Sequence, residues 1–304
     1  MNQNYIVGVD FGGTKIKTGI ITPKGEVTGD IITVPTQAED DRDSIIKRMV
    51  QSIEAAMASV GCTRKDISGI GIGSPGPLNI KDGIVLTPPN LPTFQNVPLR
   101  KKITEAFELP VYVNNDANAF VLGECYFGAG KDARIAFGVT LGTGFGSGIV
   151  MDKKIYLGVT ETAAEIWCSP YQEGILEDYI SGRGITKMYQ QRTGQKSEPP
   201  EIAQAARQGQ AEAIDTWKEF GHHLGKALAY MVNILDPDVG IIGGSLSKAY
   251  DLFEEEMFQT LRRYINPNPL EHVRILKAQL GDQAGFIGAA CLVLESQLGL
   301  KMGT

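Results

Sequence analysis

The sequence lacks the features that mark secreted and membrane-spanning proteins. It has only four cysteines, at positions 62, 125, 168 and 291, and no C-x-x-C pair, so we interpret them as reduced thiols rather than a disulfide framework. No apolar run approaches the roughly 20 residues that a membrane span needs. The N-terminus, MNQN, is polar and leads at once into a predicted strand, so we expect no signal peptide. These absences predict a cytoplasmic protein.

Positive charge is also scarce. The chain has 29 Lys and Arg against 35 Asp and Glu, which gives a formal net charge of −6. This balance argues against broad nucleic-acid binding, which needs a basic face. Backbone amides and a divalent ion can still hold phosphate on an acidic protein. With 304 residues and 42% hydrophobic content, the chain can bury a large core, and its length suggests about two domains.

Two glycine-rich segments resemble each other at an offset of 130 residues: 6–21 and 136–150. Each is an apolar run, a turn of Gly and Thr, and a second apolar run, a pattern that predicts strand, tight turn and strand. Glycine there allows positive φ and lets backbone N–H groups approach an anion. Either segment alone is more typical of an ordinary hairpin without a ligand. The repeat favours a duplicated fold in which two loops bind one polyphosphate.

The elements after the first hairpin predict a ribonuclease-H-like α/β unit. A strand over 26–34, an amphipathic helix over 42–60 and a buried strand over 67–72 follow in order. The strand leads into Ser74-Pro75-Gly76-Pro77, which cannot be helical because proline lacks a donor and restricts its neighbour. Open α/β sheets bind ligands at such carboxyl ends of strands.

A second junction of this kind follows a predicted helix over 99–107 and a strand over 111–113. The strand leads through Asn115 and Asp116 into a helix ending near residue 126. An Asp in this position is usually a helix N-cap, an interpretation that stays open beside a catalytic one. Residues 128–134 form a polar break, where we place the start of the second domain.

Beyond the second hairpin the pattern predicts mainly helices. We expect helices over 174–185, 201–208, 211–235, 250–264 and 284–298, and strands over 239–242 and 273–278. The last helix would pack on the first domain. His222 and His223 are adjacent on a helix and face different ways, which makes a poor metal pair, and we place His272 in a loop.

Taken together, five motifs resemble the ROK family of sugar kinases within the actin-like ATPase superfamily, over nearly the whole chain. The motifs are Asp10-Phe11-Gly12-Gly13-Thr14-Lys15, Ser74-Pro75-Gly76-Pro77, Asn115-Asp116-Ala117-Asn118-Ala119, Leu141-Gly142-Thr143-Gly144 and Ile242-Gly243-Gly244. The resemblance implies an α/β fold of two ribonuclease-H-like lobes with ATP and a hexose in the interlobe cleft. The first lobe would be residues 1–127 with the C-terminal helix 284–304, the second 128–283. Relatives are often homodimers.

The resemblance also implies roles for individual residues. Asp116 would be the general base that takes a proton from a sugar hydroxyl, and Asp10 would hold Mg²⁺, mostly through water. The implied phosphate and nucleotide contacts are Gly12, Gly13, Thr14, Lys15, Gly142, Thr143 and Gly144, with Gly243 and Gly244 at the adenosine. The implied hexose contacts are Gly76, Asn90, Asn115, Asp116, Glu165 and Glu177.

One stretch departs from the family pattern. ROK kinases usually carry Glu-Ile-Gly-His followed by a cysteine cluster, which together bind a structural zinc. Here Trp167 and Cys168 follow Glu165-Ile166, and the cysteine cluster is missing. A zinc site needs about four N or S ligands, so we predict no structural zinc. The replaced His normally also touches the sugar, which makes the sugar preference uncertain.

The resemblance therefore predicts an ATP- and Mg²⁺-dependent kinase that phosphorylates a hexose, with the 6-hydroxyl of glucose as first choice. The stretch from Gly174 to Ile185 resembles the bacterial glucokinase branch. Fructose, mannose or an N-acylated amino sugar is the alternative acceptor, and a non-catalytic sugar-binding pseudokinase is the alternative without turnover. We do not expect a sugar-responsive repressor, because a strand begins by Tyr5 and leaves no room for an N-terminal helix-turn-helix domain.

Overall fold

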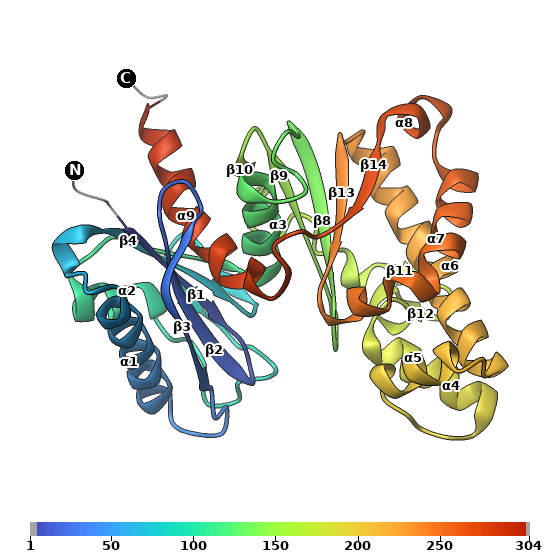
Figure 1. Cartoon of the computed structure of the whole chain (residues 1–304), viewed down its shortest axis with the longest axis horizontal. Coiled ribbons are helices and arrows are strands. Elements are labelled where there is room, and N and C mark those ends of the chain that lie inside the picture. The colour runs from blue at the N-terminus through green and yellow to red at the C-terminus, as the bar shows by residue number, and fades with distance from the viewer. Residues whose placement is uncertain (1–4, 302–304) are drawn as a thin grey trace. The chain divides into compact units, whose positions relative to one another are not determined.

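The computed structural model describes residues 5–301. The chain divides into two compact units (Figure 1). Unit 1 contains the residues up to 131, residues 153–161 and the residues from 279 onward, and unit 2 contains residues 132–152 and 162–278. The lobe boundaries expected from the sequence did not include the return of residues 153–161 to unit 1.

Unit 1 is built on a five-stranded sheet of order β3-β2-β1-β4-β7. Its strands are β1 (Tyr5–Phe11), β2 (Lys15–Ile21), β3 (Val27–Pro35), β4 (Ile67–Ser74) and β7 (Val111–Asn115). The strands β1, β4 and β7 are parallel, whereas β2 and β3 continue the sheet as antiparallel neighbours. This arrangement is the α/β unit that the order of strands and helices predicted. A separate short hairpin pairs β5 (Leu78–Asn79) with β6 (Ile84–Val85).

Helices cover both faces of this sheet (Figure 1). The helices α1 (Arg42–Val60) and α2 (Leu99–Phe107) lie on one face, and α3 (Asp116–Phe127) and α9 (Ala284–Lys301) lie on the other. Both α1 and α2 have the predicted bounds. Asp41 caps the start of α1, since its carboxylate accepts hydrogen bonds from two backbone N–H groups of the first turn.

The helix α9 packs directly on the strands because glycines face it. A Cβ atom on Gly8 would lie 1.9 Å from the carbonyl oxygen of Phe286, and one on Gly71 would lie 1.8 Å from that of Ala289. No side chain fits at these two strand positions. The C-terminal helix therefore belongs to the core of unit 1.

Unit 2 contains the repeated hairpin. Its strands follow the order β9-β8-β13-β14, with β8 (Ile135–Leu141), β9 (Phe145–Met151), β13 (Val239–Gly243) and β14 (Arg274–Lys277). The short strand β10 (Lys154–Ile155) belongs to the segment 153–161 of unit 1. The strands β8 and β9 are antiparallel, and β13 is parallel to both β8 and β14. The same strand connections therefore start both units, as the sequence repeat predicted.

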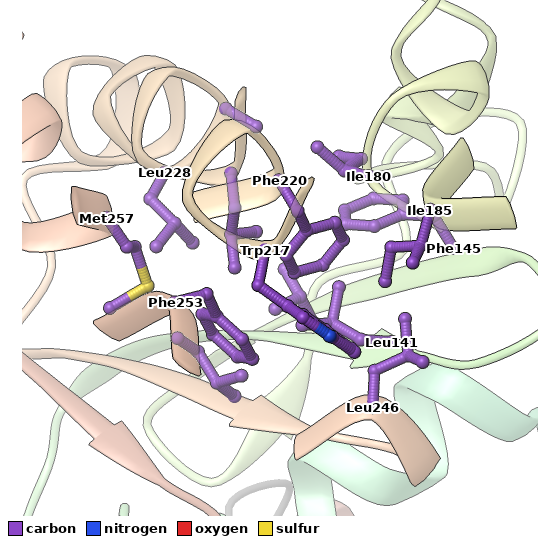
Figure 2. Close-up of a cluster of buried hydrophobic side chains, with 14 of the residues drawn as sticks. Leu141, Phe145, Ile180, Ile185, Trp217, Phe220, Leu228, Leu246, Phe253 and Met257 are labelled. Carbon is purple, nitrogen blue, oxygen red and sulfur yellow. The ribbon is translucent and has the colours of Figure 1, made fainter. Parts of the chain in front are cut away.

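The helices of unit 2 enclose a large aromatic core. They are α4 (Gly182–Thr193), α5 (Pro199–Arg207), α6 (Ala211–Leu235), α7 (Tyr250–Tyr264) and α8 (Pro267–His272). Figure 2 shows Trp217 and Phe220 of α6 packed with Phe253 of α7. Leu141 and Phe145, the residues on either side of the second glycine turn, are buried in the same cluster (Figure 2). The core thus anchors both ends of that turn.

Two predictions of local structure are wrong, and the open interpretation of Asp116 as a helix N-cap is not supported. Residues 174–185 do not form one helix, because β12 (Gly174–Ile175) and a 3-10 helix (Leu176–Asp178) precede α4. Ser181 interrupts the helical pattern by accepting the N–H of Gly184, which caps α4. His272 ends α8 instead of lying in a loop, and the cap of α3 is Asn115 instead of Asp116. None of the helices within residues 5–301 has the length and apolar character needed to cross a membrane.

Candidate functional site

The carboxyl edge of the sheet in unit 1 gathers the predicted catalytic side chains. Gly73 of β4 pairs with Asp10 of β1 on one side and with Asn114 of β7 on the other. Neighbouring strands lie about 4.8 Å apart, so Asp10 and Asn114 are separated by about 10 Å along this edge. Asn115 and Asp116 follow directly. Strand register therefore brings two carboxylates that are 106 positions apart in the sequence to the same edge.

The first glycine turn connects β1 to β2 beside this edge. The N–H of Gly12 donates to the carbonyl of Lys15 at 3.0 Å, and the Thr36 hydroxyl donates to the carbonyl of Gly12 at 2.6 Å. Gly13 lies against Asn90, since a Cβ atom on Gly13 would be 2.9 Å from the Cβ of Asn90. The structure thus places Asn90 next to a turn whose Thr14 and Lys15 are exposed.

The Asp10 carboxylate is suited to a divalent cation. Burial raises its pKa, while the positive charges of Lys17 and Lys15 act in the opposite direction. Gly285 keeps the approach to it open, because a Cβ atom there would lie 2.4 Å from Asp10 Oδ2. A half-buried carboxylate gains from a cation that replaces lost hydration. Mg²⁺ commonly takes one or two carboxylates and completes its shell with water and phosphate oxygens, which fits a single Asp.

Asp116 occupies the first turn of α3. The Asn115 side chain caps this helix by accepting the N–H groups of Ala117 and Asn118. The Asn115 amide nitrogen points towards Gly76, because a Cβ atom on Gly76 would lie 3.5 Å from it. Asp116 itself is exposed, and its carboxylate accepts the N–H of Ala117 at 2.8 Å. A carboxylate that is exposed at a strand edge can accept a proton from a bound hydroxyl.

The second glycine turn is held from both ends. The N–H of Gly142 donates to the carbonyl of Gly144 at 3.0 Å, and the N–H of Gly182 donates to the carbonyl of Gly142 at 2.8 Å. On the other side, the N–H of Phe145 donates to Glu177 Oε2 at 2.8 Å, and Glu177 forms an ion pair with Arg183. The sequence did not predict that Glu177 braces this turn.

A cavity of about 680 Å³ opens beside the second turn. Gly142 and Thr143 form part of its wall, and Trp217, Leu246 and Pro199 contribute apolar surface. Five cationic side chains line it together with one carboxylate, that of Glu198: Arg183, Lys187, Lys196, Arg207 and Lys248. A mixed apolar and cationic cavity of this size suits a ligand with a flat apolar group and a negatively charged tail.

The predicted adenosine contacts lie next to this cavity rather than in its wall. Gly243 ends β13, and Gly244 has φ of 85°, with no room for a Cβ atom beside the Leu141 backbone. The residues that follow them do line the cavity: Ser245, Leu246, Lys248 and Ala249. The glycine pair therefore makes the bend that directs this segment into the cavity wall.

Sequence reasoning missed the contribution of α4. Its lining residues, Arg183, Thr186, Lys187 and Gln190, follow the spacing i, i+3, i+4, i+7 and so share one helix face. The spacing was visible in the sequence. The helix expected over 174–185 ends within the first turn of α4, so the expected boundary cuts this helix face after Arg183 and separates it from the other three lining residues.

The stretch that departs from the family pattern forms a 3-10 helix at Ile166–Cys168. Burial raises the pKa of Glu165, and a hydrogen bond from the Trp167 side chain partly offsets that rise. The Cys168 thiol is exposed and lies 3.6 Å from the carbonyl oxygen of Glu165. Within residues 5–301, no group of three or more His, Cys, Asp or Glu side chains could hold a metal ion. The absence of a structural zinc stays a prediction.

The ROK family model matches residues 6–296, and the chain belongs to this family. Two curated relatives span almost the whole chain. A glucokinase of Halalkalibacterium halodurans is 30% identical over 100% of this chain and 99% of its own length. An N-acetyl-D-glucosamine kinase of Photobacterium profundum is 31% identical over 95% and 99%.

A solved structure agrees with this assignment. The ROK family glucokinase from Streptomyces griseus, in complex with glucose and AMPPNP, aligns with a TM-score of 0.81 at 31% identity. The alignment covers 95% of this chain and 99% of that one. The fold is thus that of the actin-like ATPases, as predicted. Because these relatives are sugar kinases that differ in their sugar, the comparisons support a ROK sugar kinase without determining the hexose.

Proposed function

We propose that the protein transfers the γ-phosphate of ATP to a hydroxyl of a hexose, with the 6-hydroxyl of glucose as the preferred acceptor. The observation that carries this proposal is the edge of the sheet in unit 1. Strand register places Asp10 beside a glycine turn there and Asp116 at the start of α3. A metal-binding carboxylate and a proton-accepting carboxylate are the two acidic groups that phosphoryl transfer to an alcohol requires.

In this mechanism Asp116 accepts the hydroxyl proton as the sugar oxygen attacks. Asn115, Asn90 and the backbone at Gly76 lie nearby in unit 1 and can orient the sugar through hydrogen bonds. The hexose contacts of Glu165 and Glu177 are part of the proposal and rest on the resemblance alone. Phosphoryl transfer needs little covalent chemistry from the protein, so positioning and charge dominate the rate.

ATP, the phosphate donor, would bind where the structure offers a cavity and backbone donors that suit a nucleotide. The cavity of unit 2 takes the nucleoside, and its cationic lining attracts the polyphosphate. The N–H groups of residues 13–14 and 143–144 would offer donors for phosphate oxygens, because those of Gly12 and Gly142 already donate within their own turns. Asp10 would hold Mg²⁺, which, when bound, neutralises charge on the phosphate oxygens. The cytoplasmic location and a homodimeric state remain predictions.

An ADP-release screen tests the proposal. The purified chain would be assayed with ATP, Mg²⁺ and each of glucose, mannose, fructose, N-acetylglucosamine and N-acetylmannosamine, with a blank that lacks sugar. We expect the highest kcat/KM with glucose. Faster turnover of an amino sugar would support the proposed kinase activity but identify the amino sugar, and not glucose, as the preferred acceptor. Binding of sugar without ADP release from any of them would favour the pseudokinase alternative.

A further inference from the structure

The segment between the two glutamates of the predicted acceptor site has little structure of its own. From Glu165 to Asp178 it contains two 3-10 helices of three residues each and a hairpin of β11 (Pro170–Tyr171) with β12 (Gly174–Ile175). An isolated two-stranded hairpin is marginally stable in water. Something outside the segment must therefore hold it in one conformation.

An aromatic cluster connects this hairpin to α6. The Tyr171 hydroxyl and His223 Nδ1 are 2.8 Å apart, and both residues are more than nine-tenths buried. Tyr179, which follows the second 3-10 helix, packs edge-on against both rings, with centroids 5.2 Å from Tyr171 and 4.9 Å from His223. Three edge-to-face ring contacts and one buried hydrogen bond thus join the segment to a 25-residue helix.

The charge state of His223 gives this hydrogen bond a direction. Burial lowers the pKa of His223, so the imidazole is neutral near pH 7. Its second nitrogen, Nε2, lies 3.7 Å from Glu219 Oε1 and is the favoured position for the single ring proton. Nδ1 is then an acceptor, and the Tyr171 hydroxyl donates to it.

We propose that the Tyr171–His223 hydrogen bond, with the Tyr179 ring packed on it, positions the acceptor-binding segment 165–178. Tyr171 and His223 are positioning residues in this proposal, which rests on the proposed function in so far as Glu165 and Glu177 bind the hexose. The cluster fixes both the hairpin and the residue after the second 3-10 helix to the same helix, α6.

Tyr171→Phe tests the proposal with a minimal change, since it removes the hydroxyl and keeps the ring. We expect amide hydrogen exchange within residues 169–178 to become about 5- to 10-fold faster while α7 is unchanged. We also expect KM for the hexose to rise about 3- to 10-fold, and to rise more than KM for ATP, which Glu177 links to the same segment through the second glycine turn. Tyr179→Phe is the matched control because it keeps all three rings and the Tyr171–His223 bond.

The two readouts separate the possible failures. Unchanged exchange in Tyr171→Phe would overturn the anchor, and faster exchange with an unchanged KM for the hexose would overturn its positioning role. If the parent protein neither binds nor phosphorylates a hexose, the proposed function fails, while the exchange data still decide whether the anchor exists. Should Tyr171→Phe not fold, His223→Asn and His223→Leu replace it: Asn retains an acceptor near Nδ1, so only the Leu variant should show the faster exchange.

Discussion

The Glu177 carboxylate accepts a hydrogen bond from the N–H of Phe145 at 2.8 Å, directly after the second glycine turn. The same oxygen lies over Gly144, where a Cβ atom would be 2.6 Å from it. Glu177 also pairs with Arg183, which lines the cavity of unit 2. A residue that the family resemblance placed at the sugar therefore also supports the turn proposed to bind phosphate.

This contact predicts that nucleotide binding depends on Glu177. Glu177→Ala removes the acceptor for the Phe145 N–H, and we expect nucleotide affinity, measured by calorimetry without sugar, to fall about 5- to 10-fold. Glu177→Gln keeps an acceptor and should lose only about twofold. Nucleotide affinity equal to that of the parent in Glu177→Ala would show that the turn does not need this brace.

Asp116 is expected to act on the rate and not on nucleotide binding. Asp116→Ala should lower kcat about 10²- to 10⁴-fold, the usual cost of removing an acid–base group, and leave KM for ATP within a few fold. Steady-state kinetics with the best sugar of the screen measure both values. Glu105→Gln, which removes an exposed carboxylate on α2, is a control for the loss of one negative charge. A kcat equal to that of the parent would remove Asp116 from the mechanism.

Zinc should play no part in this protein. Cys168 stands where the family has a metal-binding His, and the cysteines that complete the site are missing. Elemental analysis of the purified chain should find far less than one zinc per chain. After treatment with EDTA, Mg²⁺ alone should restore the full turnover. Stoichiometric zinc that resists the chelator would show that ligands were missed.

Stability should fall as the pH rises through the range in which Glu295 loses its proton. Burial in α9 raises the pKa of Glu295 to about 7, partly offset by a hydrogen bond from the N–H of Ile155. The native state therefore binds this proton more tightly than the unfolded chain, in which an ordinary Glu titrates near pH 4.3. The contribution is complete below about pH 4.3 and is lost by about pH 7. Denaturant unfolding at several pH values should show this slope, and Glu295→Gln should remove it.

Gly8→Ala should be among the most damaging single substitutions in unit 1. The added Cβ atom would lie 1.9 Å from the carbonyl oxygen of Phe286, so β1 and α9 would have to separate. We expect a loss of about 3 kcal/mol in the free energy of unfolding, the upper end of the range typical of overpacked cores. Gly194→Ala is the control: nothing lies within 4 Å of the added atom, and only its φ of 75° is unfavourable. Equal effects of the two variants would contradict this account of the packing.

Much of the fold could be predicted because its signals are local. The helices α1, α2, α6 and α7 have the predicted bounds, since apolar spacing along a helix depends on nearby residues only. The 174–185 stretch failed for the opposite reason. Its helical pattern is continuous, but the Ser181 cap and the contact of Gly184 with the Asp178 backbone divide it. Such a division depends on packing that no spacing pattern contains.

The sequence by itself was enough to predict the two glycine turns, to select Asp10 and Asp116 as candidate site residues, and to identify the family to which the chain belongs. Turn chemistry and motif order are properties of neighbouring residues, so they can be identified without coordinates. Only the tertiary structure decided which face of α4 lines the cavity, that Glu177 supports the second turn, and that Tyr171 meets His223. Those relations join residues tens of positions apart, such as the 52 that separate Tyr171 from His223. They exist only once the sheet and helices have packed and excluded water from the groups that touch.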